Sequence, residues 1–146
     1  MTLEVVLRYR TRRPWAPAPG TLRSWALLAT GGRGGELGIR IVGSAESRAL
    51  NQRYRGKRGP TNVLSFPGAS GRGRRLIGDV VVCAPLVARE AREQRKPLRA
   101  HWAHMVVHGT LHLLGFGHER AADARRMEGL ERRLLARLGF ADPYGA

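Results

Sequence analysis

Cysteine, acidic residues and long apolar runs are all scarce in this sequence of 146 residues. The single cysteine, Cys83, excludes an intramolecular disulfide framework and suits a reducing compartment. No apolar run approaches the roughly 20 residues that a membrane-spanning helix needs. The amino terminus, MTLEVVLRYR, places Glu4 early and lacks the basic region and apolar region of a secretory signal. We therefore expect a cytoplasmic protein with no membrane partner.

The shortage of acidic residues leaves a large excess of positive charge. Lys and Arg number 26 against 11 Asp and Glu, for a formal net charge of +15, and only Lys57 and Lys96 are lysines. A basic surface gains affinity for a polyanion by releasing its counterions, so the excess favours a nucleic-acid partner. The alternative is that a chain rich in Arg, Gly and Ala reflects coding bias.

We expect one domain spanning residues 1–146, because this length supports one hydrophobic core and is too short for two. The apolar pattern predicts four strands, at residues 3–9, 37–42, 62–66 and 77–83. Helical spacing predicts five helices, at residues 21–30, 44–54, 85–95, 98–114 and 121–138. Ser44 is expected to cap the second helix. The glycine-rich segment 68–75 is expected to be a hairpin loop, with an RNA contact as the less favoured alternative.

Three of the five histidines fall within HGTLHLLGFGH, at His108, His112 and His118. His108 and His112 lie one turn apart on one face of the predicted helix and can aim their imidazoles at one point. A third ligand must come from outside the helix, because one from the same helix would project further along the axis. Gly115 is expected to end the helix in a left-handed conformation, and Gly117 to free the backbone again. His118 would then complete a three-histidine metal site.

Three neutral imidazoles leave zinc its full double charge and an open fourth position. Zinc in that state acidifies a bound water strongly, so the pattern indicates a catalytic and hydrolytic site. A structural site would take four protein ligands, usually with cysteine, and Cys83 falls in a predicted strand. Other divalent transition metals also suit three imidazoles.

The residue after the first histidine separates two kinds of hydrolase. Helical zinc proteases carry HExxH, in which the glutamate takes a proton from the attacking water, and this chain has Gly109 at that place. A metalloprotease is therefore the disfavoured alternative. Cleavage of a phosphodiester instead needs a cation near the metal to offset charge on the phosphoryl oxygens. Spacing alone leaves four candidates for this cation, which are Arg53, Arg55, Lys57 and Arg58.

Four stretches of the chain together resemble the YbeY family of bacterial endoribonucleases. They are LNQRYRGKRGPTNVLSFP, IGDVVVC, KPLRAHWAHMVVHGTLHLLGFGH and MEGLERRLLARLGFADPY. The resemblance implies an α+β fold with a mixed sheet of about four strands packed with helices. It also implies zinc on His108, His112 and His118, and a functional arginine at Arg55.

The activity that this resemblance implies is a single-strand-specific endoribonuclease. Such an enzyme acts in maturation of the 3′ end of small-subunit rRNA and in ribosome quality control, with the ribosome or its proteins as possible partners. A third hypothesis is a zinc-stabilised RNA- or ribosome-binding factor without turnover.

One residue departs from the family pattern beside the last histidine. The family usually has an acidic residue directly before it, where this chain has Gly117. Glu119 is the nearest replacement in the sequence, and a carboxylate there could orient a ligand or a water. Of the two remaining histidines, His104 lies on the ligand face and is a candidate to line the cleft. His101 is expected to pack or to cap.

Overall fold

A computed structural model describes residues 2–68, 75–117 and 119–145. Its four strands are β1 (Leu3–Tyr9), β2 (Gly35–Val42), β3 (Val63–Pro67) and β4 (Leu76–Cys83). Its five helices are α1 (Pro19–Thr30), α2 (Ser44–Arg55), α3 (Ala84–Glu93), α4 (Leu98–Leu113) and α5 (Ala121–Arg137). The predicted elements are confirmed, with their ends shifted by at most two residues. Most of the predicted hairpin loop, residues 69–74, lies outside the described residues.

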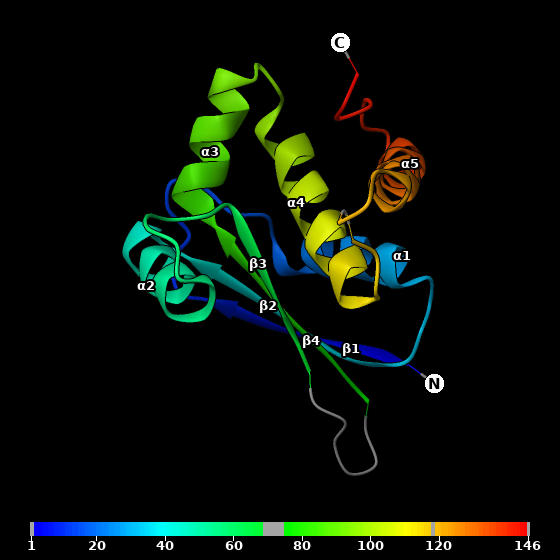
Figure 1. The fold of residues 1–146 in the computed structure, drawn as a ribbon, viewed down its shortest axis with the longest axis horizontal. Coiled ribbons are helices and arrows are strands. Elements are labelled where there is room, and N and C mark those ends of the chain that lie inside the picture. The colour runs from blue at the N-terminus through cyan, green and yellow to red at the C-terminus, as the bar shows by residue number, and fades with distance from the viewer. Residues whose placement is uncertain (1, 69–74, 118, 146) are drawn as a thin grey trace.

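The sheet is mixed and its strand order is β1-β2-β4-β3. β1 runs parallel to β2 and β2 parallel to β4, whereas β3 pairs antiparallel with β4. The α+β fold with a mixed four-stranded sheet is therefore confirmed (Figure 1). No helix within the described ranges is long and apolar enough to cross a membrane.

Alternation along β4 divides the core between the two faces of the sheet. Val80 and Val82 belong to the main core cluster, which includes side chains of α1, α4 and α5. Val81 and Cys83 point the other way, into a smaller cluster against which Leu50 of α2 packs. Cys83 is buried in this strand, which agrees with its exclusion as a metal ligand.

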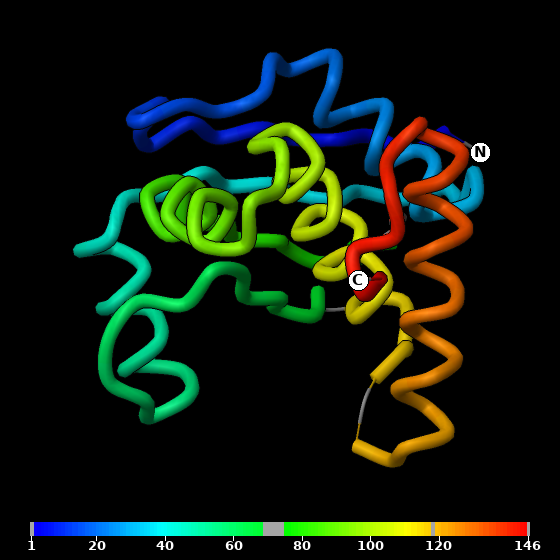
Figure 2. The backbone as a smooth tube through the Cα atoms, turned by 90° about the horizontal axis from the view of Figure 1, so that it is seen from above, coloured from blue at the N-terminus to red at the C-terminus, as the bar shows by residue number. Residues whose placement is uncertain are grey.

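Helix α4 lies over the sheet with α3 on one side and α5 on the other (Figures 1 and 2). Nearly every residue from His101 to Leu111 is buried, so the helix is covered on all sides, as expected for a helix inside a core. His101 and His104 are therefore buried in this helix, His108 is half-buried, and His112 follows the buried stretch and is exposed.

Gly109 is the point of closest approach between α4 and the sheet. A Cβ at this position would lie 2.7 Å from Cγ1 of Val80 and 3.1 Å from Cγ2 of Val63. The Ser65 hydroxyl also donates a hydrogen bond to the Gly109 carbonyl, 2.9 Å away. Position 109 thus faces the strands, and the side chain of a protease glutamate would collide with β4.

Replacing Gly109 by alanine is expected to destabilise the fold by about 1–3 kcal/mol, because the added methyl overpacks the contact with Val80. This cost exceeds the helix-propensity gain of up to about 1 kcal/mol. The measurement is the free energy of unfolding in urea. Gly129→Ala in α5 is the matched control, since its Cβ would come no closer than 3.7 Å to another atom, and it should be stabilising. A neutral Gly109→Ala would contradict the close approach.

The structure at the end of α4 agrees with the prediction for Gly115 and differs from the prediction for Gly117. Gly115 has φ 101°, its N–H donates to the carbonyl of His112, and the N–H of Phe116 donates to that of Leu111. This is a Schellman arrangement that ends the helix, so the prediction for Gly115 is confirmed. The prediction for Gly117 is wrong, because its φ is not in the left-handed region and a Cβ there would meet nothing within 4 Å.

The predicted cap of α2 is also wrong. Gly43 is the N-cap residue and makes no side-chain cap, while Ser44 is the first residue of the helix. Gly43 has the extended backbone of an N-cap residue. Because it is a glycine, the helix begins without a polar side chain at its cap position.

Candidate active site

A cleft of about 490 Å³ lies between the carboxyl end of α2, strand β3 and helix α4. Its walls are formed by Tyr54, Arg55, Thr61, Asn62, Val63, Leu64, Ser65, Phe66, His108 and His112. The cleft therefore joins two of the three predicted metal ligands to one of the four candidate cations, Arg55.

Arg55 is held at the cleft because α2 is tied to the segment that follows it. The Ser47 hydroxyl donates to the Thr61 carbonyl at 2.9 Å and accepts from the Thr61 N–H at 3.0 Å. The Asn51 side chain donates to the carbonyl of Gly59 at 2.9 Å. These bonds fix the last turn of α2, which carries Arg55, beside the strand that forms the cleft wall.

His108 is oriented by a buried carboxylate from α5. Glu131 is 0% exposed, and it accepts hydrogen bonds from His104 Nε2 at 2.8 Å, from His108 Nδ1 at 2.7 Å and from the Tyr144 hydroxyl. Burial acts to raise the pKa of Glu131, but the hydrogen bonds from these three groups outweigh it and lower the pKa to about 2. Burial and the bond to Glu131 raise the pKa of Tyr144, so its hydroxyl remains a donor. Glu131 is thus an ionised acceptor at neutral pH.

Glu131 and the two histidines bonded to it form a candidate metal site of two histidines and one glutamate. Single ligand atoms of His104, His108 and Glu131 all lie within 4.8 Å of one another, and this is the one such group among the described residues. A cation placed between them would have to displace the hydrogen bonds that both Glu131 oxygens already accept.

The residues fit a metal better on the cleft side of His108. An ionised Glu131 assigns the proton of His108 to Nδ1, and this leaves Nε2 as the atom able to bind a metal. A ligating histidine that donates its other ring nitrogen to a carboxylate is the usual arrangement in metal sites. His112, one turn along α4, lines the same cleft. His118, the third predicted ligand, lies outside the described residues.

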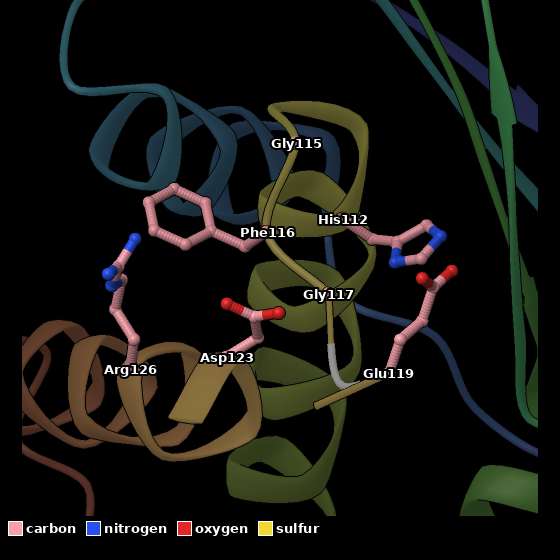
Figure 3. A pocket seen from close by; sticks show the side chains of 7 residues that line it. All are labelled: His112, Gly115, Phe116, Gly117, Glu119, Asp123 and Arg126. Atoms are coloured by element: carbon pink, nitrogen blue, oxygen red, sulfur yellow. The ribbon is translucent and has the colours of Figure 1, made fainter. Parts of the chain in front are cut away.

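His112 also borders a second hollow of about 310 Å³ between the end of α4 and the start of α5. Figure 3 shows the Glu119 carboxylate pointing toward the His112 imidazole, with Asp123 and Arg126 on the α5 side. Glu119 therefore lies where a carboxylate can orient His112, near the position at which the family pattern expects an acidic residue and this chain has Gly117.

Sequence reasoning missed Glu131 and Tyr144. Glu131 is 23 residues from His108 and Tyr144 is 40 residues from His104, and no local spacing connects them. His101, expected to pack or cap, is buried and bonds Glu90 at 2.8 Å, outside the Glu131 network.

Known proteins resemble this chain in both sequence and fold. A model of the family described as endoribonuclease YbeY matches residues 24–139. A relative named Endoribonuclease YbeY from Halorhodospira halophila is 56% identical over 136 residues, covering 88% of each chain. Another of that name, from Stenotrophomonas maltophilia, is 49% identical over 150 residues, covering 97% of this chain and 93% of the relative.

A solution structure of a Thermotoga maritima protein aligns with a TM-score of 0.58. It covers 99% of this chain and 100% of its own at 21% identity, and at that identity it supports the fold alone.

Proposed function

Because the chain belongs to the endoribonuclease YbeY family, we propose that it is a zinc-dependent endoribonuclease specific for single-stranded RNA. It acts in the cytoplasm, as one domain, in maturation of the 3′ end of small-subunit rRNA and in ribosome quality control. Its metal ligands are His108, His112 and His118, and its catalytic cation is Arg55. Ribosomal RNA is its substrate, and the ribosome or its proteins direct it there.

The observation that carries this proposal is the shared cleft of His108, His112 and Arg55. The histidines would hold a zinc ion, and the bound ion would supply Lewis acidity for activating the attacking oxygen at neutral pH. Arg55 offsets the negative charge that gathers on the phosphoryl oxygens as the bond breaks. Glu131 keeps His108 in one orientation and one tautomer. The net charge of +15 adds affinity for RNA that does not depend on sequence.

Peptide hydrolysis finds no support in the same cleft. The residue that follows His108 is Gly109, which faces Val80 and Val63 on the sheet. A general base at this position would collide with the sheet, so the fold has no room for one there. The net charge still favours a second candidate, an RNA-binding factor without turnover.

One assay distinguishes the three functions. The protein is incubated with labelled single-stranded RNA, duplex RNA and casein, each with and without a chelator. We expect cutting of single-stranded RNA alone, and its loss in chelator. Binding of RNA without cutting would contradict the enzyme and support the binding factor, and digestion of casein would support the protease.

Replacing Glu131 by glutamine is expected to weaken zinc binding by roughly 10- to 100-fold, because glutamine offers one acceptor oxygen and cannot orient both imidazoles. Affinity is measured by competition with a chromophoric chelator. Glu90→Gln is the matched control, since Glu90 makes the equivalent bond to His101 on the same helix and should leave the affinity unchanged. Equal weakening in both variants would contradict a specific role for Glu131.

A further inference from the structure

Tyr54 is the most exposed large apolar side chain of the cleft wall. It is 56% exposed, and it directly precedes Arg55 at the end of α2. Tyrosine rings are enriched at binding surfaces, because the ring is apolar and the hydroxyl is polar. The position of this ring, beside the proposed catalytic cation, calls for a ligand with an aromatic or flat face.

The ring is exposed but held in place. Its centroid lies 5.0 Å from that of Phe66 on β3, and the two rings meet edge to face at 70°. Phe66 is itself packed against the smaller core cluster beneath α2. The Arg53 guanidinium lies 5.4 Å from the Tyr54 centroid. A ring fixed in this way loses little conformational freedom when a ligand lies on it.

Two polar side chains of the cleft wall already use their donors within the protein. Asn62 donates to both carboxylate oxygens of Glu90, at 3.1 and 3.3 Å, and Ser65 donates to the Gly109 carbonyl. Hydrogen-bond reading of base edges is therefore weak at these two residues. What the cleft offers instead is a ring face, and every nucleobase has a face that can stack on it.

We infer that Tyr54 is a stacking site for one unpaired nucleobase next to the phosphate that Arg55 contacts, a reading that rests on the proposed function. A base inside a duplex is stacked on both sides and cannot lie on the ring. Tyr54 therefore contributes to the preference for single strands, and it does so with tolerance of base identity.

The test combines Tyr54 variants with RNA that lacks one base. Tyr54→Leu keeps an apolar contact with Phe66 but removes the ring face, and it should raise KM for a single-stranded oligonucleotide by roughly 5- to 100-fold with a smaller change in kcat. Tyr54→Phe should restore KM. Trp15→Leu, which removes an exposed ring outside the cleft wall, should leave KM unchanged.

An abasic residue is then moved along the oligonucleotide around the cleavage position. At one position the missing base should raise the KM of the unchanged protein. At the same position it should cause no further rise in the KM of Tyr54→Leu. An unchanged KM in Tyr54→Leu, or an abasic penalty that persists in that variant, would overturn the stacking site. The dissociation constant, measured by fluorescence anisotropy with the same oligonucleotides, tests the site even if no RNA is cut. If the protein cuts no RNA but the dissociation constants change as expected for KM, the proposed function is refuted and the stacking site is supported.

Discussion

Replacing His112 by alanine is expected to lower the cleavage of single-stranded RNA by on the order of a thousandfold. In the proposed site this change removes one of three imidazoles that hold the metal, and the activation of the attacking oxygen is lost with it. His112 borders both the cleft and the hollow that contains Glu119, so its loss opens the metal position from two sides. Single-turnover cleavage of a labelled oligonucleotide, with zinc added in excess, measures the effect.

The matched control for this prediction is His101→Gln. His101 is buried on the same helix and bonds Glu90, and glutamine can still donate a hydrogen bond to that carboxylate. Cleavage by His101→Gln should stay near that of the unchanged protein. If His112→Ala retained most of its activity while folded, the assignment of the metal to the cleft would be refuted.

Replacing Arg55 by alanine is expected to lower cleavage by roughly 100- to 1,000-fold while the metal content stays unchanged. Arg55 lines the cleft with His108 and His112 but comes from α2, so its loss removes charge stabilisation without removing a ligand. Arg55→Lys should recover part of the rate, because an ammonium restores the charge without the planar pair of donors. The measurements are kcat on single-stranded RNA and zinc per chain.

Arg48→Ala separates a catalytic role from a simple loss of positive charge. Arg48 is exposed on the same helix, two turns before Arg55, and its removal lowers the net charge by the same amount. It should weaken RNA binding slightly and in a salt-dependent way, and leave kcat unchanged. A similar fall in kcat for both variants, or a loss of zinc from Arg55→Ala, would contradict the role of Arg55.

The elements of this fold could be predicted from sequence because their signals are local. Apolar and β-branched residues mark β1, alternation marks most of β2, and an apolar run marks β4, which is covered on both faces. Gly115 marks the end of α4 because the left-handed turn there favours glycine. The two local predictions that were wrong, Ser44 and Gly117, each concern the conformation of a single residue at the end of a helix.

The site could be predicted only in part, for a physical reason. The spacing of His108 and His112 is a property of one helix and can be recognised in the sequence. The choice of Arg55 among four basic residues came from the family pattern, and the described cleft wall agrees with it. The bonds of Glu131 to His104 and His108 depend on how α5 packs on α4, which no short-range pattern encodes. In the sequence Gly109 indicates only that a protease glutamate is absent, whereas its close approach to Val80 depends on how α4 packs on the sheet.

The most direct test of the account is the zinc content of two histidine variants purified in parallel. The proposed site predicts about one zinc per chain in the unchanged protein and in His104→Gln, and none in His112→Ala. In that outcome His104 serves Glu131 as a hydrogen-bond donor and His112 binds the metal. Loss of zinc from His104→Gln with full zinc in His112→Ala would place the metal among His104, His108 and Glu131 and contradict the account.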